Sequence, residues 1–182
     1  RNFTQGSLQQ SSNSLDVAIN GNGFFEVQLP DGTIGYTRDG SFQLDSQGRL
    51  VTSGGLPVAN GITVPQGATS ISISESGVVS ATLAGNPQPQ QLGQLAMSSF
   101  INAAGLQPVG QNMYKESAAS GAPQQGQPGT NGLGVMRQGF LETSNVNVVE
   151  ELVTMIQTQR AYEMNSKAIQ TSDQMLAKLS QL

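Results

Sequence analysis

The chain has 182 residues, enough for one sizeable domain or for one domain with an appendage. Only 11% of the residues are charged, and a formal net charge of -4 excludes a broad basic face for nucleic acid, which needs clustered Lys and Arg. The sequence contains neither His nor Cys, which excludes disulfides, thiol nucleophiles, His-based triads and the usual zinc sites. An enzyme of this composition would have to use carboxylates, Lys or Tyr.

A mainly β fold is predicted for residues 15–116, where short apolar runs alternate with Gly, Pro, Asn and Asp about every 8 to 12 residues. Four dipeptides in this range tolerate positive φ angles and predict tight turns: Asn20-Gly21, Asn22-Gly23, Asp31-Gly32 and Asp39-Gly40. We therefore expect an irregular β-module of short antiparallel strands whose first half is a meander. The expected strands are residues 15–19, 24–29, 33–37, 41–44, 49–52, 62–64, 70–74, 78–83 and 91–98.

The segments around this β-module differ from it in composition. Residues 1–14 are expected to be extended, and because position 1 is Arg and not Met, we expect a fragment. Residues 117–134 are rich in Gly, Pro, Ser and Gln, which predicts a long loop that makes a contact elsewhere, and residues 135–145 return from it. No run approaches the roughly 20 apolar residues of a membrane span, and no cleavable signal peptide opens the sequence, so we expect no membrane insertion.

One long C-terminal α-helix is predicted for residues 146–182, which no Gly or Pro interrupts. Asn147 and Glu150 have the spacing of a capping box, Glu151 adds negative charge at the N-terminus, and Lys178 adds positive charge near the C-terminus. At 1.5 Å per residue the helix would be roughly 50 Å long, more than the width of a small domain. We therefore expect it to project from the β-module.

An apolar seam with a period of seven residues follows this helix, and small polar residues such as Asn165 lie within it. Polar residues in such a seam weaken the packing but can fix its register and its partner. The seam could cover the β-module, but the length of the helix favours a partner helix. The residues expected at this interface are Val148, Leu152, Met155, Ile156, Tyr162, Asn165, Ile169, Met175, Leu176, Leu179 and Leu182.

Four stretches of the sequence resemble signatures of the bacterial flagellar rod and hook family, the axial proteins. They are residues 138–152 (QGFLETSNVNVVEEL) and 159–167 (QRAYEMNSK) near the C-terminus, and residues 15–25 (LDVAINGNGFF) and 36–42 (YTRDGSF) in the β-module. The resemblance runs nearly from end to end and is strongest to the distal rod members, with the proximal rod and hook members as close alternatives. Members of this family begin with a helix that nothing here matches, which implies that about the first third is missing.

The resemblance implies a structural subunit without catalytic activity or cofactors. Such subunits assemble into a helical homopolymer, the drive shaft that crosses the periplasm and transmits torque from motor to hook. It implies that the apolar seam is a polymer interface, where N- and C-terminal helices pair as a coiled coil inside an outer wall of β-modules. It further implies export by the flagellar type III apparatus. The implied partners are other copies of the chain, the proximal rod and hook proteins, the hook–rod interface and the surrounding ring proteins.

Two aspartates are candidates for chemistry, but turn formation explains them better. Asp39 and Asp45 could be the paired carboxylates of a glycosidase acting on peptidoglycan. Each, however, stands in a turn sequence, Asp39 before Gly40 and Asp45 at the start of residues 45–48. The segment 45–48 also lacks the further acidic ligands of a calcium loop. We expect no catalytic, cofactor-binding or metal site.

The aromatic residues leave a second alternative open. Phe24, Phe25, Tyr36 and Phe42 are expected to pack in the core and across strands. They could instead form a carbohydrate-binding platform, so the best hypothesis outside the family is a β-module that binds carbohydrate or peptidoglycan.

Two arginines in the β-module also have two interpretations. Arg38 and Arg49 are expected to be ordinary solvated charges. The alternative is a salt bridge between subunits, to an acidic residue such as Asp31 or Glu75.

Overall fold

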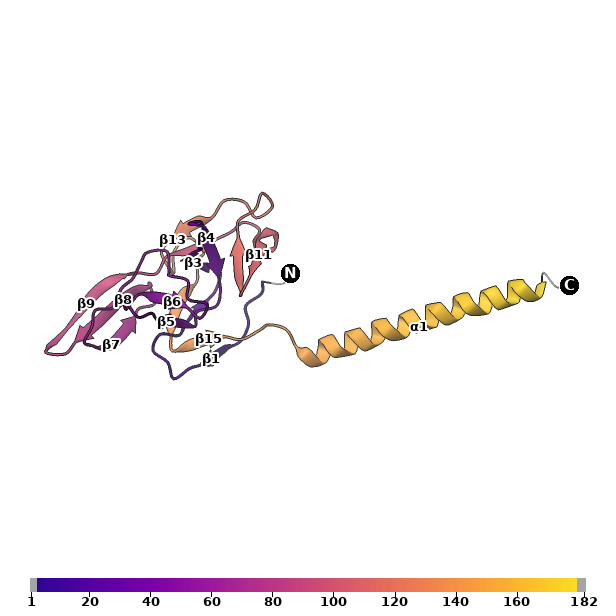
Figure 1. The fold of residues 1–182 in the computed structure, drawn as a ribbon, viewed down its shortest axis with the longest axis horizontal. Coiled ribbons are helices and arrows are strands. Elements are labelled where there is room, and N and C mark those ends of the chain that lie inside the picture. The colour runs from indigo at the N-terminus through magenta and orange to yellow at the C-terminus, as the bar shows by residue number, and fades with distance from the viewer. Residues whose placement is uncertain (1–2, 180–182) are drawn as a thin grey trace. The chain divides into compact units, whose positions relative to one another are not determined.

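The computed structural model describes the backbone of residues 3–179 and the side chains of residues 3–176. The chain divides into two compact units, Arg1–Thr143 and Ser144–Leu182. In the part that is described, the first unit consists of short antiparallel strands and the second of one α-helix, which confirms the predicted fold class (Figure 1).

The strands of the first unit form five small sheets. The largest has six strands in the order β11-β12-β4-β3-β10-β13, and a three-stranded sheet has the order β7-β8-β9. Three strand pairs complete the unit: β1 with β15, β2 with β14, and β5 with β6. The bounds are β1 Leu8–Gln10, β2 Val17–Asn20, β3 Phe24–Gln28, β4 Ile34–Thr37, β5 Phe42–Leu44, β6 Leu50–Thr52, β7 Ala68–Ile73, β8 Val78–Leu83, β9 Asn86–Gln94, β10 Met97–Ser99, β11 Gln107–Gly110, β12 Met113–Lys115, β13 Gln124–Gly126, β14 Val135–Gln138 and β15 Phe140–Glu142, with a 3-10 turn at Ala103–Gly105.

The predicted turn at Asp31-Gly32 closes the hairpin between β3 and β4. Gly32 has a φ of 79°, and the Leu29 amide donates to the carbonyl of Thr33 at 2.9 Å. The Asp31 carboxylate accepts a hydrogen bond from the Thr33 amide at 2.9 Å, which fixes the turn. The local sequence therefore determines this hairpin, as the turn chemistry predicts.

The prediction of a meander is wrong at Asn20-Gly21-Asn22-Gly23. These residues connect β2 to β3, but the two strands do not pair with each other. Instead β2 pairs with β14, in a register that places Ile19 opposite Met136. A turn sequence marks where the chain reverses, but it does not determine which strand becomes the neighbour.

Other strand predictions also need correction. Residues 62–64 form only an isolated bridge, between Thr63 and Arg49. The single strand expected at 91–98 is two strands, β9 and β10, which belong to different sheets. The expected loop 117–134 contains β13, which pairs with β10 at the edge of the six-stranded sheet.

The main core lies between the sheets and is made of fully buried aliphatic side chains and two aromatic ones. The rings of Phe25 and Phe42 meet edge to face, with 5.1 Å between their centroids. A second cluster surrounds Phe24, Tyr36 and Leu106, all of which are at most 4% exposed. The predicted core packing of the four aromatic residues is confirmed.

Gly40 is required by a close approach of two chain segments. A Cβ atom added there would lie 1.7 Å from the carbonyl oxygen of Val17, and the Gly40 carbonyl accepts a hydrogen bond from the Val17 amide. No side chain fits in this position, so Gly40 is needed for packing between the loop before β5 and strand β2.

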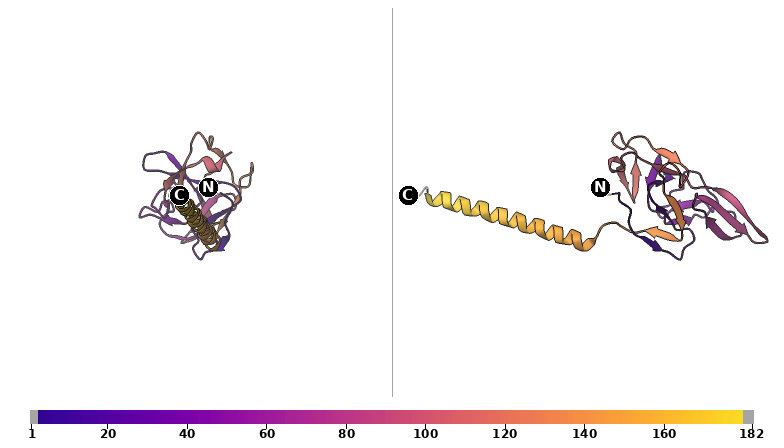
Figure 2. Two further views of the ribbon diagram at one scale, coloured as in Figure 1. Left: turned by 90° about the vertical axis from the view of Figure 1, so that its right-hand side faces the viewer. Right: turned by 180° about the vertical axis from the view of Figure 1, so that it is seen from behind.

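The second unit is the helix α1, Val148–Leu179, which Figure 2 shows as one uninterrupted helix from two further directions. Asn147 caps its N-terminus, because its side-chain oxygen accepts a hydrogen bond from the Val149 amide at 3.1 Å. Glu150 and Glu151 lie in the first turn, where carboxylates interact favourably with the helix dipole. The 32 residues correspond to about 48 Å of helix.

Candidate assembly interface

Helix α1 exposes an unusual number of large apolar side chains. Val148, Met155, Tyr162, Ile169 and Leu176 follow one another at intervals of seven, and each is at least 56% exposed. Side chains seven residues apart lie on the same face of a helix after two turns. The period found in the sequence therefore corresponds to a continuous apolar row, which we call the seam.

The other predicted interface residues also lie on the surface of α1. Leu152 and Ile156 are about half exposed, Met175 is 63% exposed, and Asn165 is exposed. The Leu179 side chain and the whole of Leu182 lie outside the described residues.

Sequence reasoning missed Val149, Val153 and Met164, which are 69%, 47% and 66% exposed. Val149 and Val153 lie beside Leu152 and Ile156 in the first turns, where they widen the apolar surface beyond the seam. The signal was present in the sequence as a spacing of three and four residues, which a period of seven does not capture.

Several hydroxyl groups of α1 are satisfied within the helix itself. The side-chain hydroxyls of Thr154, Thr158 and Thr171 each donate to the carbonyl four residues before, at distances of 3.0, 2.9 and 2.8 Å. Threonines bonded in this way can be buried without leaving an unpaired donor. They therefore do not oppose the packing of α1 against another surface.

The strand pair β1–β15 brings the two ends of the first unit together. Leu8 lies opposite Glu142 and Gln10 opposite Phe140, and the Thr143 amide donates to the Ser7 carbonyl at 2.8 Å. Because the pair is antiparallel, the chain enters β1 beside the point where it leaves β15. This point is Thr143, five residues before the first residue of α1.

Arg38 fixes this strand pair to the six-stranded sheet. Its guanidinium pairs with the Glu142 carboxylate at 2.8 Å, and it also donates to the carbonyls of Gly21 and Gly23 at 3.1 and 2.9 Å. The side chains of Arg38 and Glu142 are only 17% and 11% exposed. The prediction of a solvated Arg38 is therefore wrong, since β15 supplies a carboxylate from a distant part of the sequence.

The other arginine discussed above behaves as expected for a surface charge. Arg49 forms an exposed ion pair with Asp45, four residues before it, at 2.7 Å. Asp31, the acidic partner suggested for a contact between subunits, pairs with Lys115 of the same chain. Hydrogen bonds from Lys115 and Thr33 hold the pKa of Asp31 well below its usual range.

The two candidate catalytic aspartates each stabilise a turn. Asp39 accepts hydrogen bonds from the amide and the hydroxyl of Ser41, at 3.0 and 2.6 Å. Asp45 accepts from the amides of Gln47 and Arg49, both at 2.8 Å. These hydrogen bonds, that of the Arg49 amide first, lower the pKa of Asp45. The interpretation as turn aspartates is confirmed.

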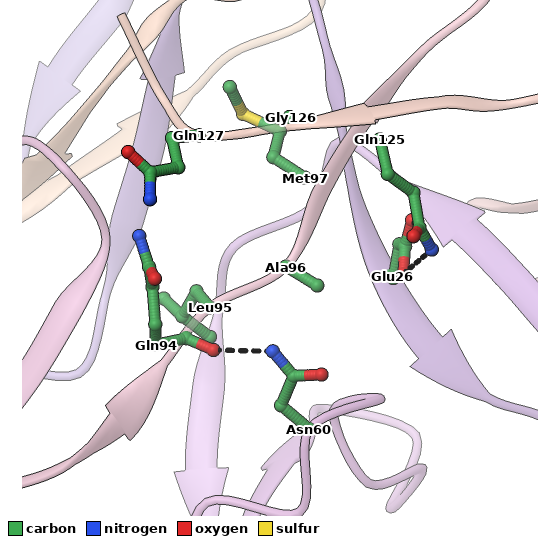
Figure 3. Close-up of a pocket in the computed structure, with 9 residues that line it drawn as sticks. All are labelled: Glu26, Asn60, Gln94, Leu95, Ala96, Met97, Gln125, Gly126 and Gln127. Atoms are coloured by element: carbon green, nitrogen blue, oxygen red, sulfur yellow. Dashed lines mark hydrogen bonds between the residues drawn. The ribbon is translucent and has the colours of Figure 1, made fainter.

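A surface pocket of about 330 Å³ lies beside the edge strand β13, and one buried carboxylate, that of Glu26, contributes to its wall (Figure 3). Glu26 is 4% exposed and accepts hydrogen bonds from Gln125 at 2.9 and 3.0 Å and from the Ser98 hydroxyl. Burial raises the pKa of Tyr36 to about 12, and the charge of Glu26 adds to this effect.

The described residues show neither a metal site nor a membrane span. Among the side chains of residues 3–176, no group of three or more acidic side chains is placed to hold a metal ion. The helix of the same range is not apolar enough to cross a membrane.

Comparison with known proteins identifies both units. Residues 18–81 match the family model described as the flagellar hook protein FlgE/F/G D1 domain. Residues 137–182 match the model described as the flagellar basal body rod FlgEFG protein C-terminal region. The first match runs from within β2 to within β8, and the second includes β15 and the whole of α1.

Individual relatives point to one branch of this group. The chain is 59% identical over 182 residues to the flagellar basal-body rod protein FlgG of Buchnera aphidicola, which covers 100% of the chain and 70% of that protein. It is 48% identical over 178 residues to FlgG of Caulobacter vibrioides, covering 98% of the chain and 68% of that protein. Its identity to FlgF of the same bacterium is lower, 35% over 171 residues, covering 92% of the chain and 64% of that protein. The chain belongs to the family of flagellar basal-body rod proteins, with FlgG proteins as its relatives of higher identity.

Proposed function

We propose that this chain is a structural subunit of the distal rod of the bacterial flagellum and that it assembles with other copies of itself into a helical polymer through the seam of α1. The proposed polymer crosses the periplasm and transmits torque from the motor to the hook. The names of the relatives support a place in the basal-body rod. The observation that carries the proposed interface is the exposed seam of α1.

Energetics favour a partner for this seam. A helix in water gains most of its stability from an apolar face that is buried, and a large exposed apolar surface usually marks an interaction site. Each large side chain moved fully out of water contributes about 1.5 to 3 kcal/mol before the cost of ordering is subtracted. Val148, Met155, Ile169 and Leu176 are all more than half exposed, so much of this free energy is available to assembly.

The strand pair β1–β15 supports one particular neighbour for α1, the N-terminal helix that the family resemblance implies. The segment that leads into β1 lies beside Thr143, whose amide donates to the Ser7 carbonyl. Thr143 is in turn close in sequence to Val148, the first residue of α1. A helix placed before β1, as the family resemblance implies, would enter the β-module next to the point where the chain leaves it toward α1, so the two helices could pair with each other. The Arg38–Glu142 pair holds the strand pair β1–β15, through which both helices would connect to the β-module, to the six-stranded sheet.

The partners, the export route and the absence of enzymatic activity are proposed from the family. The partners are other copies of the chain, the proximal rod and hook proteins, the hook–rod interface and the surrounding ring proteins. The subunit reaches the periplasm through the flagellar type III export apparatus. It has no enzymatic activity, which agrees with the turn roles of Asp39 and Asp45.

The test is the substitution of seam residues in the complete protein within its bacterium. Ile169→Asp and Leu176→Asp each place a charge in the seam, and we expect basal bodies without a distal rod and a loss of motility. Gln174→Asp is the matched control, since it adds the same charge between the two positions but on another face of α1. We expect normal rods with this control.

The level and the fold of each variant need to be measured alongside. Hydrogen exchange of residues 15–142 should be unchanged in all three variants, because the substitutions lie outside the first unit. Normal rods with Ile169→Asp and Leu176→Asp would refute the seam as the polymer interface. A β-module that loses its protection would show that α1 covers it, the alternative use of the seam.

A further inference from the structure

Glu26 is a buried carboxylate whose hydrogen-bond donors are all neutral. The Gln125 amide donates to both of its oxygens, at 2.9 and 3.0 Å, and the Ser98 hydroxyl donates to one. Among the side chains of residues 3–176 the ion pairs are Arg38–Glu142, Arg49–Asp45 and Lys115–Asp31, and none includes Glu26. Neutral hydrogen bonds offset only part of the cost of taking a carboxylate out of water.

The surroundings of Glu26 are open to a ligand on one side. Glu26 lines a pocket of about 330 Å³ whose other polar side chains are the amides of Asn60, Gln94, Gln125 and Gln127. Figure 3 shows Ala96 between these side chains, with Gln94 and Gln127 on one side of it and Glu26 with Gln125 on the other. The amides offer carbonyl oxygens but no charge, so the pocket has one negative group and several further acceptors.

From this arrangement we infer that the Glu26 pocket binds the guanidinium group of an arginine that belongs to a second copy of the chain, and we assign this arginine as Arg137. A guanidinium carries five N–H donors in a plane and can bond a carboxylate and neighbouring amide carbonyls at the same time. The pocket volume accommodates an arginine side chain, and its buried charge has the opposite sign.

Among the basic residues of the first unit that the structure describes, charge complementarity selects Arg137. Arg38, Arg49 and Lys115 already hold carboxylates of their own chain. Arg137, on the exposed side of β14, is in none of the ion pairs of the described residues. A pocket and a matching side chain at different places on one subunit give a head-to-tail contact, the type that builds helical polymers.

This contact rests on the proposed function only because two copies must meet in the polymer. The first experiment therefore tests the binding of an arginine side chain to the pocket without any polymer. N-acetyl-arginine methylamide is titrated into the whole chain while the side-chain amides of Gln125 and Gln127 are followed by NMR. We expect saturable shifts that weaken at least tenfold in Glu26→Gln. Asp45→Asn, which removes an exposed carboxylate elsewhere, should leave the binding unchanged. Absence of saturable binding, or equal binding to Glu26→Gln, would overturn the pocket.

The second experiment tests the assignment of Arg137 in assembled rods. The sequence has no Cys, so Gln127→Cys with Val135→Cys introduces the only thiols of residues 1–182, and a short bis-maleimide can join them. Val135 lies two residues before Arg137 on the same side of β14, so this variant keeps the arginine. We expect a ladder of covalent multimers in rods and none with Gln127→Cys and Lys167→Cys, where the second thiol lies on α1. Intact rods without a ladder would overturn the contact. If no rods form even with the natural sequence, the proposed function fails, whereas the arginine titration still decides the pocket.

Discussion

Arg38 connects the six-stranded sheet to the strand pair β1–β15 through a mostly buried ion pair. Its partner Glu142 is 11% exposed, so loss of the guanidinium leaves a mostly buried carboxylate without a counter-charge. The same guanidinium also satisfies the carbonyls of Gly21 and Gly23, in a turn whose sequence does not select its own strand partner. The local sequence of this turn does not determine its position in the fold. The long-range ion pair of Arg38 therefore stabilises that position.

The first prediction follows from this burial. Arg38→Ala should lower the free energy of unfolding by about 3 to 5 kcal/mol, because Glu142 then stays buried and unpaired. Urea denaturation of the whole chain, followed by circular dichroism, measures this loss. Arg49→Ala, which breaks an exposed pair, should leave the midpoint nearly unchanged, and the double variant Arg38→Met/Glu142→Gln should recover part of the stability. Equal effects of the two single alanine variants would contradict this account.

The second prediction concerns Asp31, whose pKa lies below its usual range because Lys115 and Thr33 donate to it. A folded-state pKa below the unfolded value of about 3.9 means that the unfolded chain binds more protons at low pH. The contribution of Asp31 to stability is thus present above about pH 4 and is lost as the pH falls through the folded-state pKa.

The measurement compares the natural chain with Asp31→Asn at a series of pH values. We expect the difference in unfolding free energy to be largest near about pH 6 and to shrink steadily below about pH 4. Because the pair is exposed, the difference should also shrink in high salt. A difference that does not depend on pH would show that the charge of Asp31 does not matter.

At the scale of single elements, the helix could be predicted far better than the sheets. An uninterrupted stretch from 146, the cap at Asn147 and the period of seven in the seam are local signals, and α1 at Val148–Leu179 agrees with them. Strand pairing is not local: β2 finds β14 more than a hundred residues later, through contacts such as Ile19 with Met136. Only the folded core determines such a partner.

Polar edge strands were the hardest elements to predict. Strand β13, Gln124–Gly126, has none of the β-branched or aromatic residues that favour strands, and β11, Gln107–Gly110, has only Val109, beside Pro108 and Gly110. Both lie at the ends of the six-stranded sheet, where one neighbour supplies the hydrogen bonds. Their strand conformation thus comes from the sheet and not from their own propensity. The pocket at Glu26 was missed for the same reason, because β13 forms part of its wall.

The third prediction is made for α1 as an element. If the seam is an interface, copies of the 182-residue chain should associate with each other, because two exposed apolar rows can bury each other. The associated fraction should then rise with protein concentration. Sedimentation should show an average mass that rises with concentration, and Ile169→Asp should reduce this rise whereas Gln174→Asp should not. Equal behaviour of both variants would mean that association uses another surface.

At the scale of the whole molecule, the chain combines a β unit built for contacts with a helix that exposes apolar residues. The first unit has few charges, buried aromatic residues and aspartates used in turns. The helix has the features of an element that is completed by assembly. This division could be foreseen from the sequence, because the pattern changes from short apolar runs to a helical period near residue 145. Neither the ion pair of Arg38 nor the pocket of Glu26 could be foreseen, since each joins residues that are far apart in the chain.

The central claim, that the seam of α1 is buried when subunits assemble, is tested most directly by thiol labelling. The sequence contains no Cys, so Ile169→Cys provides one thiol in the seam of these 182 residues, at a position that is 63% exposed in the single chain. The rate of maleimide labelling is compared between free subunits and isolated rods of the complete protein. We predict rapid labelling of the subunit and at least a hundredfold slower labelling in rods. Equal rates in subunits and rods would contradict the claim.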